Sequence, residues 1–402
     1  MVHRILVTGA SVAGNTAAWW LTRFGCKVEV VEKAPTFRGG GQNVDVRGSA
    51  REVLRSMELE EAAFSLRTPE KGTEWVDEND STIARFEAGS DGDDNGPTAE
   101  LEIRRGDIAK LIYDATLERA TYRFGDSIEL ISQHDRRADV TFTSGRKERY
   151  DLVVVAEGVG SHTRELVFPG ENEPRWMDLM IAYFSIPREP HDSDFARVYN
   201  TVEGRGATLK PARNNMLGAF VGIHRKPEGE HKWTLEEQRQ YILEQFSNDG
   251  WEFPRILNVM KDVDDFYFEV LRQVHMKRWS NGSVVLTGDA AWCPTGVSGI
   301  GTSLAIVGSY VLAGELYKTN DKLAALRSYE AIMRPFVKEG QNIPKIVPRM
   351  LWPQNAFELK LMRAAMRVAN NPLVKKLFAS SFARDSNQIE LPHYAVRQEI
   401  GN

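Results

Sequence analysis

The sequence predicts an α/β fold in which a parallel sheet with helices is joined to a mixed sheet and a set of C-terminal helices. Residues 4–33 (RILVTGASVAGNTAAWWLTRFGCKVEVVEK) predict strand, glycine turn, helix and strand, a βαβ unit. Two more apolar runs, 152–156 and 284–286, lead to an acid and glycines, which is typical of buried parallel strands that open onto a loop. Over residues 176–224 apolar and polar residues alternate, which favours antiparallel strands with one exposed face.

The βαβ unit carries a dinucleotide-binding fingerprint. The pattern G-x-G-x-x-G is met at Gly9 and Gly14, while Ser11 replaces the middle glycine. Ala18 is small enough for close helix packing. Glu32 ends the second strand, where an acid that binds a ribose is expected, and this acid favours a free 2′-hydroxyl, hence FAD or NAD. A plain βαβ unit with a glycine turn is the alternative.

A glycine run at 38–48 has to turn tightly before a helix expected at 50–57. Three consecutive glycines cost backbone entropy on ordering, so we expect a gain from their dihedral angles or from close approach to a ligand. A flexible loop is the alternative.

The next segments predict a hairpin, a loop and a helix. The hairpin covers 74–86 and turns around Asn79 and Asp80, and the acidic, glycine-rich stretch 87–100 predicts a solvated loop. Residues 101–107 then lead into a helix expected from 108 to about 119.

The stretch 285–305 (VLTGDAAWCPTGVSGIGTSLA) predicts a strand, an acidic elbow and a helix N-terminus. Free N–H groups and the helix dipole attract phosphate or a polarised carbonyl at such a helix start. Asp289 at the strand end can accept hydrogen bonds from sugar-like hydroxyls. Gly9, Glu157 and Asp289 thus mark three strand ends. Open α/β sheets bind ligands just beyond such ends. An ordinary βα loop is the alternative.

The rest of the chain predicts helices. Thr234 and Glu237 form a capping box before a helix at 235–246, and a second helix is expected at 254–263. Further helices are expected at 303–318, 322–340, 355–370 and 372–384.

Composition excludes several classes of function. The 402 residues are 42% hydrophobic and 27% charged, with a net charge of −5, and no Lys/Arg cluster predicts nucleic-acid binding. We expect no signal peptide and no membrane span, and Cys26 and Cys293 lie too far apart in sequence for a CxxC motif. The expectation is a cytoplasmic protein without a metal, with a small-molecule substrate and with neither nucleic acid nor membrane as partner. We expect a monomer, with a weak dimer as the alternative.

Taken together in this order, the motifs resemble those of class A FAD-dependent monooxygenases with the para-hydroxybenzoate hydroxylase fold. Within that group the sequence is most similar to the tetracycline-inactivating monooxygenases, the tetracycline destructases. The matching motifs are GASVAG with Glu32, VVVAEGVGSHTR, TGDAAWCPTGVSGIGTSLA, Tyr329-Glu330 and Arg334-Pro335. Three residues depart from the family pattern: Ser11 stands for glycine, Glu157 for aspartate and Trp292 for histidine.

The resemblance implies a division of the chain into three parts. A Rossmann-like FAD-binding domain takes residues 1–73, 101–175 and 274–340, and a mixed-sheet substrate-binding domain takes 74–100 and 176–273. The C-terminal helices, 341–402, bridge the two.

The resemblance also implies which residues hold the cofactors. FAD is expected at the pyrophosphate-binding turn, at the ribose, beside the flavin, at the ribityl chain and under the isoalloxazine ring. In that order these residues are Ser11, Val12, Ala13 and Gly14; Glu32; Arg105; Asp289; and Gly299, Gly301 and Thr302. Asp45 is expected to contact FAD, and Lys33 is a further cofactor-binding candidate. Arg38 is expected to bind NADPH, and Glu157 to contact the nicotinamide pyrophosphate.

The implied activity is hydroxylation of an aromatic or polyketide-like molecule, with NADPH or NADH as reductant and O2 added at flavin C4a as a hydroperoxide. No side chain is assigned as catalytic, because the cofactor carries the chemistry. The substrate is expected against Tyr183, Phe184, Phe220, His224 and Pro294. The alternatives are another flavin oxidoreductase, or a protein that binds or sequesters FAD without turnover.

Overall fold

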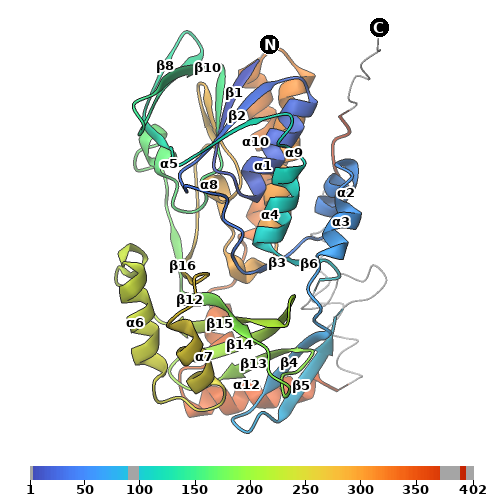
Figure 1. Cartoon of the computed structure of the whole chain (residues 1–402), viewed down its shortest axis with the longest axis vertical. Helices are drawn as coiled ribbons and strands as arrows, with labels where there is room; N and C mark the ends of the chain where they lie inside the picture. Colours follow the sequence, from blue (N-terminus) through green and yellow to red (C-terminus); the bar gives the residue numbers. More distant parts are fainter. Residues whose placement is uncertain (1–2, 89–98, 372–389, 395–402) are drawn as a thin grey trace.

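The computed structural model describes residues 3–88, 99–371 and 390–394 (Figure 1). Two large sheets lie one above the other in Figure 1, and a group of long helices packs beside the upper one. The helix predicted at 372–384 and most of the loop predicted at 87–100 lie outside the described residues.

The upper sheet has six strands in the order β17-β18-β11-β1-β2-β7. The strands are β1 (Arg4–Thr8), β2 (Lys27–Glu32), β7 (Thr121–Phe124), β11 (Leu152–Val155), β17 (Ser280–Asn281) and β18 (Val284–Leu286). Every pairing is parallel except that of β17 with β18. All residues of β11 and β18 are buried, as expected of parallel strands covered on both faces.

Helices cover this sheet. Figure 1 shows, together beside it, the helices α1 (Val12–Arg23), α4 (Arg105–Asp114), α9 (Gly301–Lys318) and α10 (Lys322–Gly340). The Ser309 hydroxyl of α9 donates to the carbonyl of Ala13 in α1 at 2.8 Å, so these two helices are in direct contact at the start of α1. The shorter helices of this part are α2 (Ser49–Ser56), α3 (Glu60–Ser65), α5 (His162–Val167) and α8 (Asp289–Trp292).

The helix predicted at 108–119 is shifted. α4 begins at Arg105 and ends at Asp114, because the extended backbone of Arg104 serves as its N-cap. Arg105 therefore stands in the first turn of a helix rather than in a connecting loop.

The lower sheet has seven strands in the order β16-β12-β15-β14-β13-β4-β5. The strands are β4 (Gly72–Val76), β5 (Thr82–Glu87), β12 (Arg175–Pro187), β13 (Ala196–Asn200), β14 (Arg205–Ala212), β15 (Met216–His224) and β16 (Tyr267–Gln273). All pairings are antiparallel except that of β13 with β4. The sheet is thus mixed, as predicted, and the hairpin predicted at 74–86 forms its edge; the limits of the three chain parts stay a prediction.

The two faces of the lower sheet differ. One face packs under α6 (Leu235–Phe246) and α7 (Phe253–Met260), and the capping box of Thr234 and Glu237 opens α6 as predicted. The opposite face, here called the inner face, carries Ile181, Tyr183, Phe220, Tyr267 and Leu271, which pack with Val297 of the loop after β18.

Smaller elements complete the structure. They are β3 (Asn43–Asp45), β6 (Glu102–Arg104), β8 (Ile128–His134), β9 (Arg137–Phe142), β10 (Lys147–Tyr150), α11 (Val347–Leu351), α12 (Ala356–Ala369) and the 3-10 turns Glu230–Lys232 and Gly296–Ser298. β3 pairs with β6, and β8, β9 and β10 form a separate sheet.

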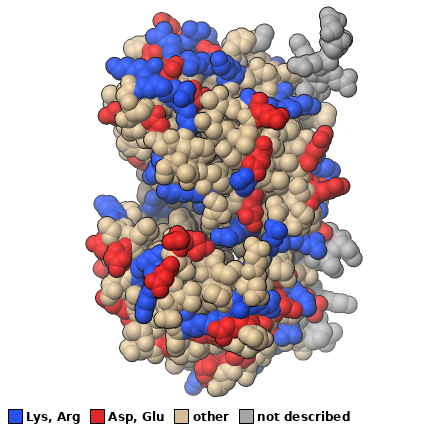
Figure 2. Space-filling model, in the orientation of Figure 1, with Lys and Arg blue, Asp and Glu red and all other residues tan. Residues whose placement is uncertain are grey.

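The surface is mixed in charge. Figure 2 shows Lys/Arg and Asp/Glu side chains interspersed over the visible face, and a hollow between the upper and lower parts of the molecule. Among the described helices, none is both long enough and apolar enough to cross a membrane.

Candidate active site

Three strand ends meet at one edge of the upper sheet. β18, β11 and β1 are adjacent and parallel, so the residues that follow them lie side by side. These residues are Gly9, Glu157 and Asp289. The convergence predicted from the sequence is therefore observed, at the edge where open α/β sheets bind ligands.

The turn between β1 and α1 is built on very close backbone contacts. A Cβ on Gly14 would lie 1.8 Å from the carbonyl oxygen of Gly9, and a Cβ on Gly9, whose φ is 98°, would lie 2.4 Å from that of Ala156. Ser11 is the N-cap of α1, but its side chain makes no capping hydrogen bond. The N–H groups of the first turn therefore stay available to an anion. They belong to Val12, Ala13 and Gly14.

Glu32 braces this turn. Its carboxylate accepts hydrogen bonds from the N–H of Ala10 at 3.0 Å and from that of Ala34 at 2.9 Å. The acid is thereby held beside the glycine turn, with lone pairs left for a hydroxyl. Lys33 and Arg38 follow and are exposed.

A second helix N-terminus, that of α9, lies on the same side of the molecule. Ile300 is its N-cap and offers no side-chain cap, while Gly299 before it has a φ of 70°. The first turn of this 18-residue helix includes Gly301 and Thr302, both partly exposed. The dipole of so long a helix favours negative charge at this end.

Asp45 lies beside the start of α9. The Arg47 N–H donates to the Ser303 hydroxyl at 3.0 Å, and a Cβ on Gly299 would lie 3.7 Å from Asp45 Oδ2. The Arg47 guanidinium is 2.8 Å from the Asp45 carboxylate. Burial, and then Glu102, nevertheless raise the pKa of Asp45 to about 6.

Arg105 and Asp289 face the lower sheet from the upper part. The Arg105 guanidinium lies 5.7 Å from the centre of the Tyr267 ring on the inner face. Burial raises the pKa of Asp289, which Arg105 opposes, and Cys293 is hydrogen-bonded to this carboxyl. Pro294 is buried, with its Cγ 3.6 Å from the position that a Cβ on Gly301 would take. The loop after β18 thus links the strand end, α9 and the inner face.

Two of the predicted substrate residues share the inner face. The rings of Tyr183 and Phe220 meet edge to face with centroids 5.0 Å apart. A Cβ on Gly296 would lie 3.9 Å from the Tyr183 hydroxyl oxygen, so this wall reaches the loop after β18. His224 belongs to the same strand as Phe220, but its Nδ1 is 2.9 Å from the Gln354 amide nitrogen and its ring is tied to the C-terminal segment.

Phe184 was expected with these residues, and the structure corrects this. It is 3% exposed and packs on the other face of the sheet, in the core with Phe266. The reason is the alternation of a strand, which points neighbours such as Tyr183 and Phe184 to opposite faces.

Glu157 has a local structural role. Its carboxylate accepts hydrogen bonds from the Ser161 hydroxyl at 2.8 Å, from the Thr163 N–H at 2.9 Å and from the Thr163 hydroxyl at 2.5 Å. Both oxygens are thus engaged at the start of α5, and the cofactor contact expected of Glu157 stays a prediction.

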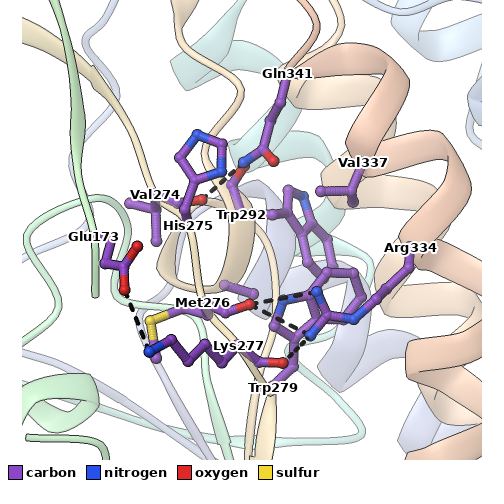
Figure 3. A pocket seen from close by; sticks show the side chains of 11 residues that line it. Glu173, Val274, His275, Met276, Lys277, Trp279, Trp292, Arg334, Val337 and Gln341 are labelled. Carbon is purple, nitrogen blue, oxygen red and sulfur yellow. Dashed lines mark hydrogen bonds and ion pairs between the residues drawn. The ribbon is translucent and has the colours of Figure 1, made fainter. Parts of the chain in front are cut away.

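Trp292 points away from the candidate site. It is 1% exposed and packs against Trp279 and Tyr329. Figure 3 shows it with Val337 and Gln341 at a separate pocket, where His275 and Arg334 also lie.

Two glutamines, of which Gln341 lines this pocket, hold the loop after β18 in place. Gln341 Nε2 donates to the carbonyls of Val274 and Trp292, each at 2.7 Å, and Gln273 Nε2 donates to that of Pro294 at 3.2 Å. The bonds to Trp292 and Pro294 thus fix the backbone of this loop at two points.

Two sets of charged residues near the site were not predicted from the sequence. Lys210 on β14 forms an ion pair with Glu102 and lies 3.5 Å from Glu70. Burial, and then Glu102, raise the pKa of Glu70 to about 8. Glu269 on β16 is the second case. A charged residue directly between two apolar ones in a strand is the signal that could have found both Lys210 and Glu269.

The residues around the site fit FAD. Two helix N-termini without side-chain caps offer N–H groups to phosphate and to a polarised ring carbonyl. Buried polar atoms without a partner among the described residues line the same region, including Gln42 Oε1 and Thr295 Oγ1. Asp289 and Glu32 supply acceptors for hydroxyl groups.

Comparison with known proteins agrees with this arrangement. The profile of the FAD binding domain family matches residues 3–341. A flavin-dependent monooxygenase from an unknown prokaryotic organism is 33% identical over 395 residues, which cover 97% of this chain and 99% of the relative. The crystal structure of the tetracycline destructase Tet(51) is 29% identical, with a TM-score of 0.82, over 98% of this chain and 100% of that one.

A third likeness concerns the fold alone. The structure of Klebsiella pneumoniae HpxO, which was solved with FAD and uric acid, is 17% identical, with a TM-score of 0.75, over 94% of this chain and 96% of that one. Together with the family match over most of the chain, these likenesses establish that the chain belongs to the FAD binding domain family and is a flavin-dependent monooxygenase.

Proposed function

We propose that this monooxygenase uses NADPH or NADH to hydroxylate an aromatic or polyketide-like small molecule that binds against the inner face. The observation that carries the proposal is the meeting of Arg105, Asp289 and the uncapped start of α9 with an aromatic wall. Tyr183, Phe220 and Tyr267 form that wall, with ring centroids 5.0 Å and 6.0 Å apart. Flat rings of a substrate pack well against such a surface.

Each part of FAD has residues suited to it. The first turn of α1 would bind the pyrophosphate, and Glu32 the adenosine ribose. Asp289 would accept hydrogen bonds from the ribityl hydroxyls, and the start of α9, with Asp45 and Arg105 close by, would bind the flavin ring. When bound, FAD supplies the transfer of electrons from the reduced nicotinamide to O2.

The protein itself has three tasks in this proposal. The inner face positions the substrate ring, the loop of Pro294 and Gly296 closes the site toward α9, and the buried surroundings exclude bulk water from the reacting atoms. Arg38 is exposed near the glycine run and suits the added phosphate of NADPH.

We further propose that the chain works as a cytoplasmic monomer. Neither Cys26 nor Cys293 forms a disulfide among the described residues, which suits a reducing compartment.

The test is a substrate screen on the purified protein. Flavin content is measured first, and then NADPH consumption and incorporation of oxygen from labelled O2 into a panel of phenols and aromatic polyketides. The proposal predicts bound FAD, consumption stimulated by part of the panel, and labelled product. Protein that holds FAD but transfers oxygen to no member of the panel would contradict the substrate class.

A further inference from the structure

Glu269 brings an acidic side chain to the inner face. In β16, Phe268 and Val270 belong to the core under α6 and α7, while Tyr267 and Leu271 belong to the inner face. Glu269 stands between the latter two and pairs with Ile181 of β12, another residue of the inner face. Alternation along the strand therefore directs its carboxylate toward Arg105 and Asp289.

The Glu269 side chain lies inside the molecule with a small part of its surface exposed, and its carboxylate has no hydrogen-bond or ion-pair partner among the described residues. Among the described residues, no hydrogen-bond donor and no cation lies within bonding distance of its oxygens. Three other buried acids of this region have partners: Glu102 has Lys210, Asp45 has Arg47, and Asp289 has Cys293. A buried carboxylate without a partner costs free energy, so its retention points to a partner that arrives with the ligand.

Burial and the neighbouring charges shift the pKa of Glu269 to near neutral pH. Burial, and then Asp289, raise the pKa of Glu269 to about 7, and Arg105 opposes the rise. The nearby hydroxyls stay protonated, because Glu269 and burial raise the pKa of Tyr267, and burial raises that of Tyr183. The titratable and charged groups that face Glu269 are Asp289, Arg105, Arg272, Tyr183, Tyr267 and Cys293.

We propose that Glu269 accepts the proton of a phenolic or enolic hydroxyl of the substrate, and so is a catalytic residue of the reaction. The inference rests on the proposed function and narrows its substrate class to aromatic or polyketide-like molecules with an ionisable hydroxyl. The O–H bond of the substrate breaks, its electron pair stays on the substrate oxygen, and the proton forms an O–H bond with the Glu269 carboxylate. Nothing is oxidised or reduced in this step.

The surroundings suit such a transfer. The negative charge moves from Glu269 to the substrate oxygen, and the Arg105 guanidinium, above the Tyr267 ring, stabilises it there. The resulting oxyanion pushes electron density into the ring, which makes the ring carbons more reactive toward an electrophilic oxygen. A group that ionises near the working pH is also the most effective proton acceptor.

The test compares Glu269→Gln and Glu269→Asp holoenzymes with wild type and with Glu118→Gln, a control at an exposed glutamate. The probes are para-substituted phenols, from weakly acidic ones to para-nitrophenol, which is largely ionised at the assay pH. For weakly acidic phenols we expect Glu269→Gln to lower kcat by about 100-fold or more, and Glu269→Asp by less. The loss should shrink toward none for para-nitrophenol, because that substrate arrives without its proton.

The pH profile gives a second readout. With a weakly acidic phenol, kcat of the wild type should rise up to about pH 7 and level off, and Glu269→Gln should lose this rise. A loss of equal size for all the phenols, or an unchanged pH profile, would show a structural role and overturn the inference.

Two controls separate this inference from the proposed function. FAD content and NADPH oxidation without substrate should equal wild type in both variants, since proton transfer from the substrate enters neither. If the wild type holds FAD and hydroxylates substrates without an ionisable hydroxyl but none of the phenols, the inference is overturned while the proposed function stands. If it holds no FAD, both fail.

Discussion

The sharpest test of the cofactor turn is Gly14→Ala. The added Cβ would lie 1.8 Å from the Gly9 carbonyl oxygen, and ordinary contact begins at 3.4 Å, so the turn has to open by about 1.6 Å. Both sides of the contact are backbone, so no flexible side chain can move aside. We expect the overpacking to lower the free energy of unfolding by about 1–3 kcal/mol.

The same opening moves the first-turn N–H groups of α1 away from a bound pyrophosphate. A hydrogen bond to a charged group is worth about 1.5–3 kcal/mol, so losing one or two raises the Kd for FAD by about 100-fold. The assays are FAD titration by fluorescence quenching and unfolding in urea. Gly250→Ala is the matched control, because a Cβ there meets nothing within 4 Å. Gly14→Ala protein that binds FAD as tightly as this control would show that the close contact of Gly14 with Gly9 does not shape the FAD site.

Four further predictions concern the site and its charges. Asp289→Ala should lower FAD occupancy after purification, and full occupancy would remove Asp289 from the ribityl site. Arg38→Ala should raise KM for NADPH with FAD content intact, so an unchanged KM would contradict its role. Lys210→Met should cost about 3 kcal/mol in urea unfolding at neutral pH, because it leaves Glu102 buried without its cation; a change under about 1 kcal/mol would argue against the pair. The raised pKa of Glu70 means that wild type loses folding stability as pH rises from the ordinary carboxyl range to about 8, where the buried group ionises. Glu70→Gln cannot ionise, so its stability relative to wild type should increase over that range. Urea midpoints of the two proteins that differ by the same amount at every pH would contradict this.

Local patterns predicted the elements that depend on short stretches of chain. The spacing of Gly9 and Gly14 was sufficient to predict the first βαβ unit, and the capping box of Thr234 and Glu237 was sufficient to predict where α6 begins. The apolar runs before Glu157 and Asp289 predicted buried parallel strands, and the rule for open α/β sheets predicted a ligand beyond their ends. The structure places β11 next to β1, and β18 next to β11.

What the sequence could not show depends on partners distant in the chain. Ser161 and Thr163 donate hydrogen bonds to the Glu157 carboxylate, and the strand pattern before Glu157 did not predict these partners. The register of β12 against β15 and β16 decides that Tyr183 meets Phe220 and that Phe184 does not. One residue of slip would reverse these faces, and alternation alone does not set the register.

The charged residues of the lower sheet were missed for the same reason. Lys210 and Glu269 lie on strands whose faces are assigned only once α6 and α7 are seen to cover the opposite side. On a strand pattern alone, either residue could face solvent. Their role at the site follows from the packing of the two parts of the molecule.

We propose above that this chain binds FAD at the adjacent strand ends of the upper sheet and transfers oxygen to a ring held against the inner face. The most direct measurement is mass spectrometry of the product formed by FAD-loaded protein from a phenol, NADPH and labelled O2. We expect one labelled oxygen attached to the ring of the product, formed only when FAD, NADPH and O2 are all present. NADPH consumption that yields hydrogen peroxide but no labelled product with any phenol or polyketide would contradict it.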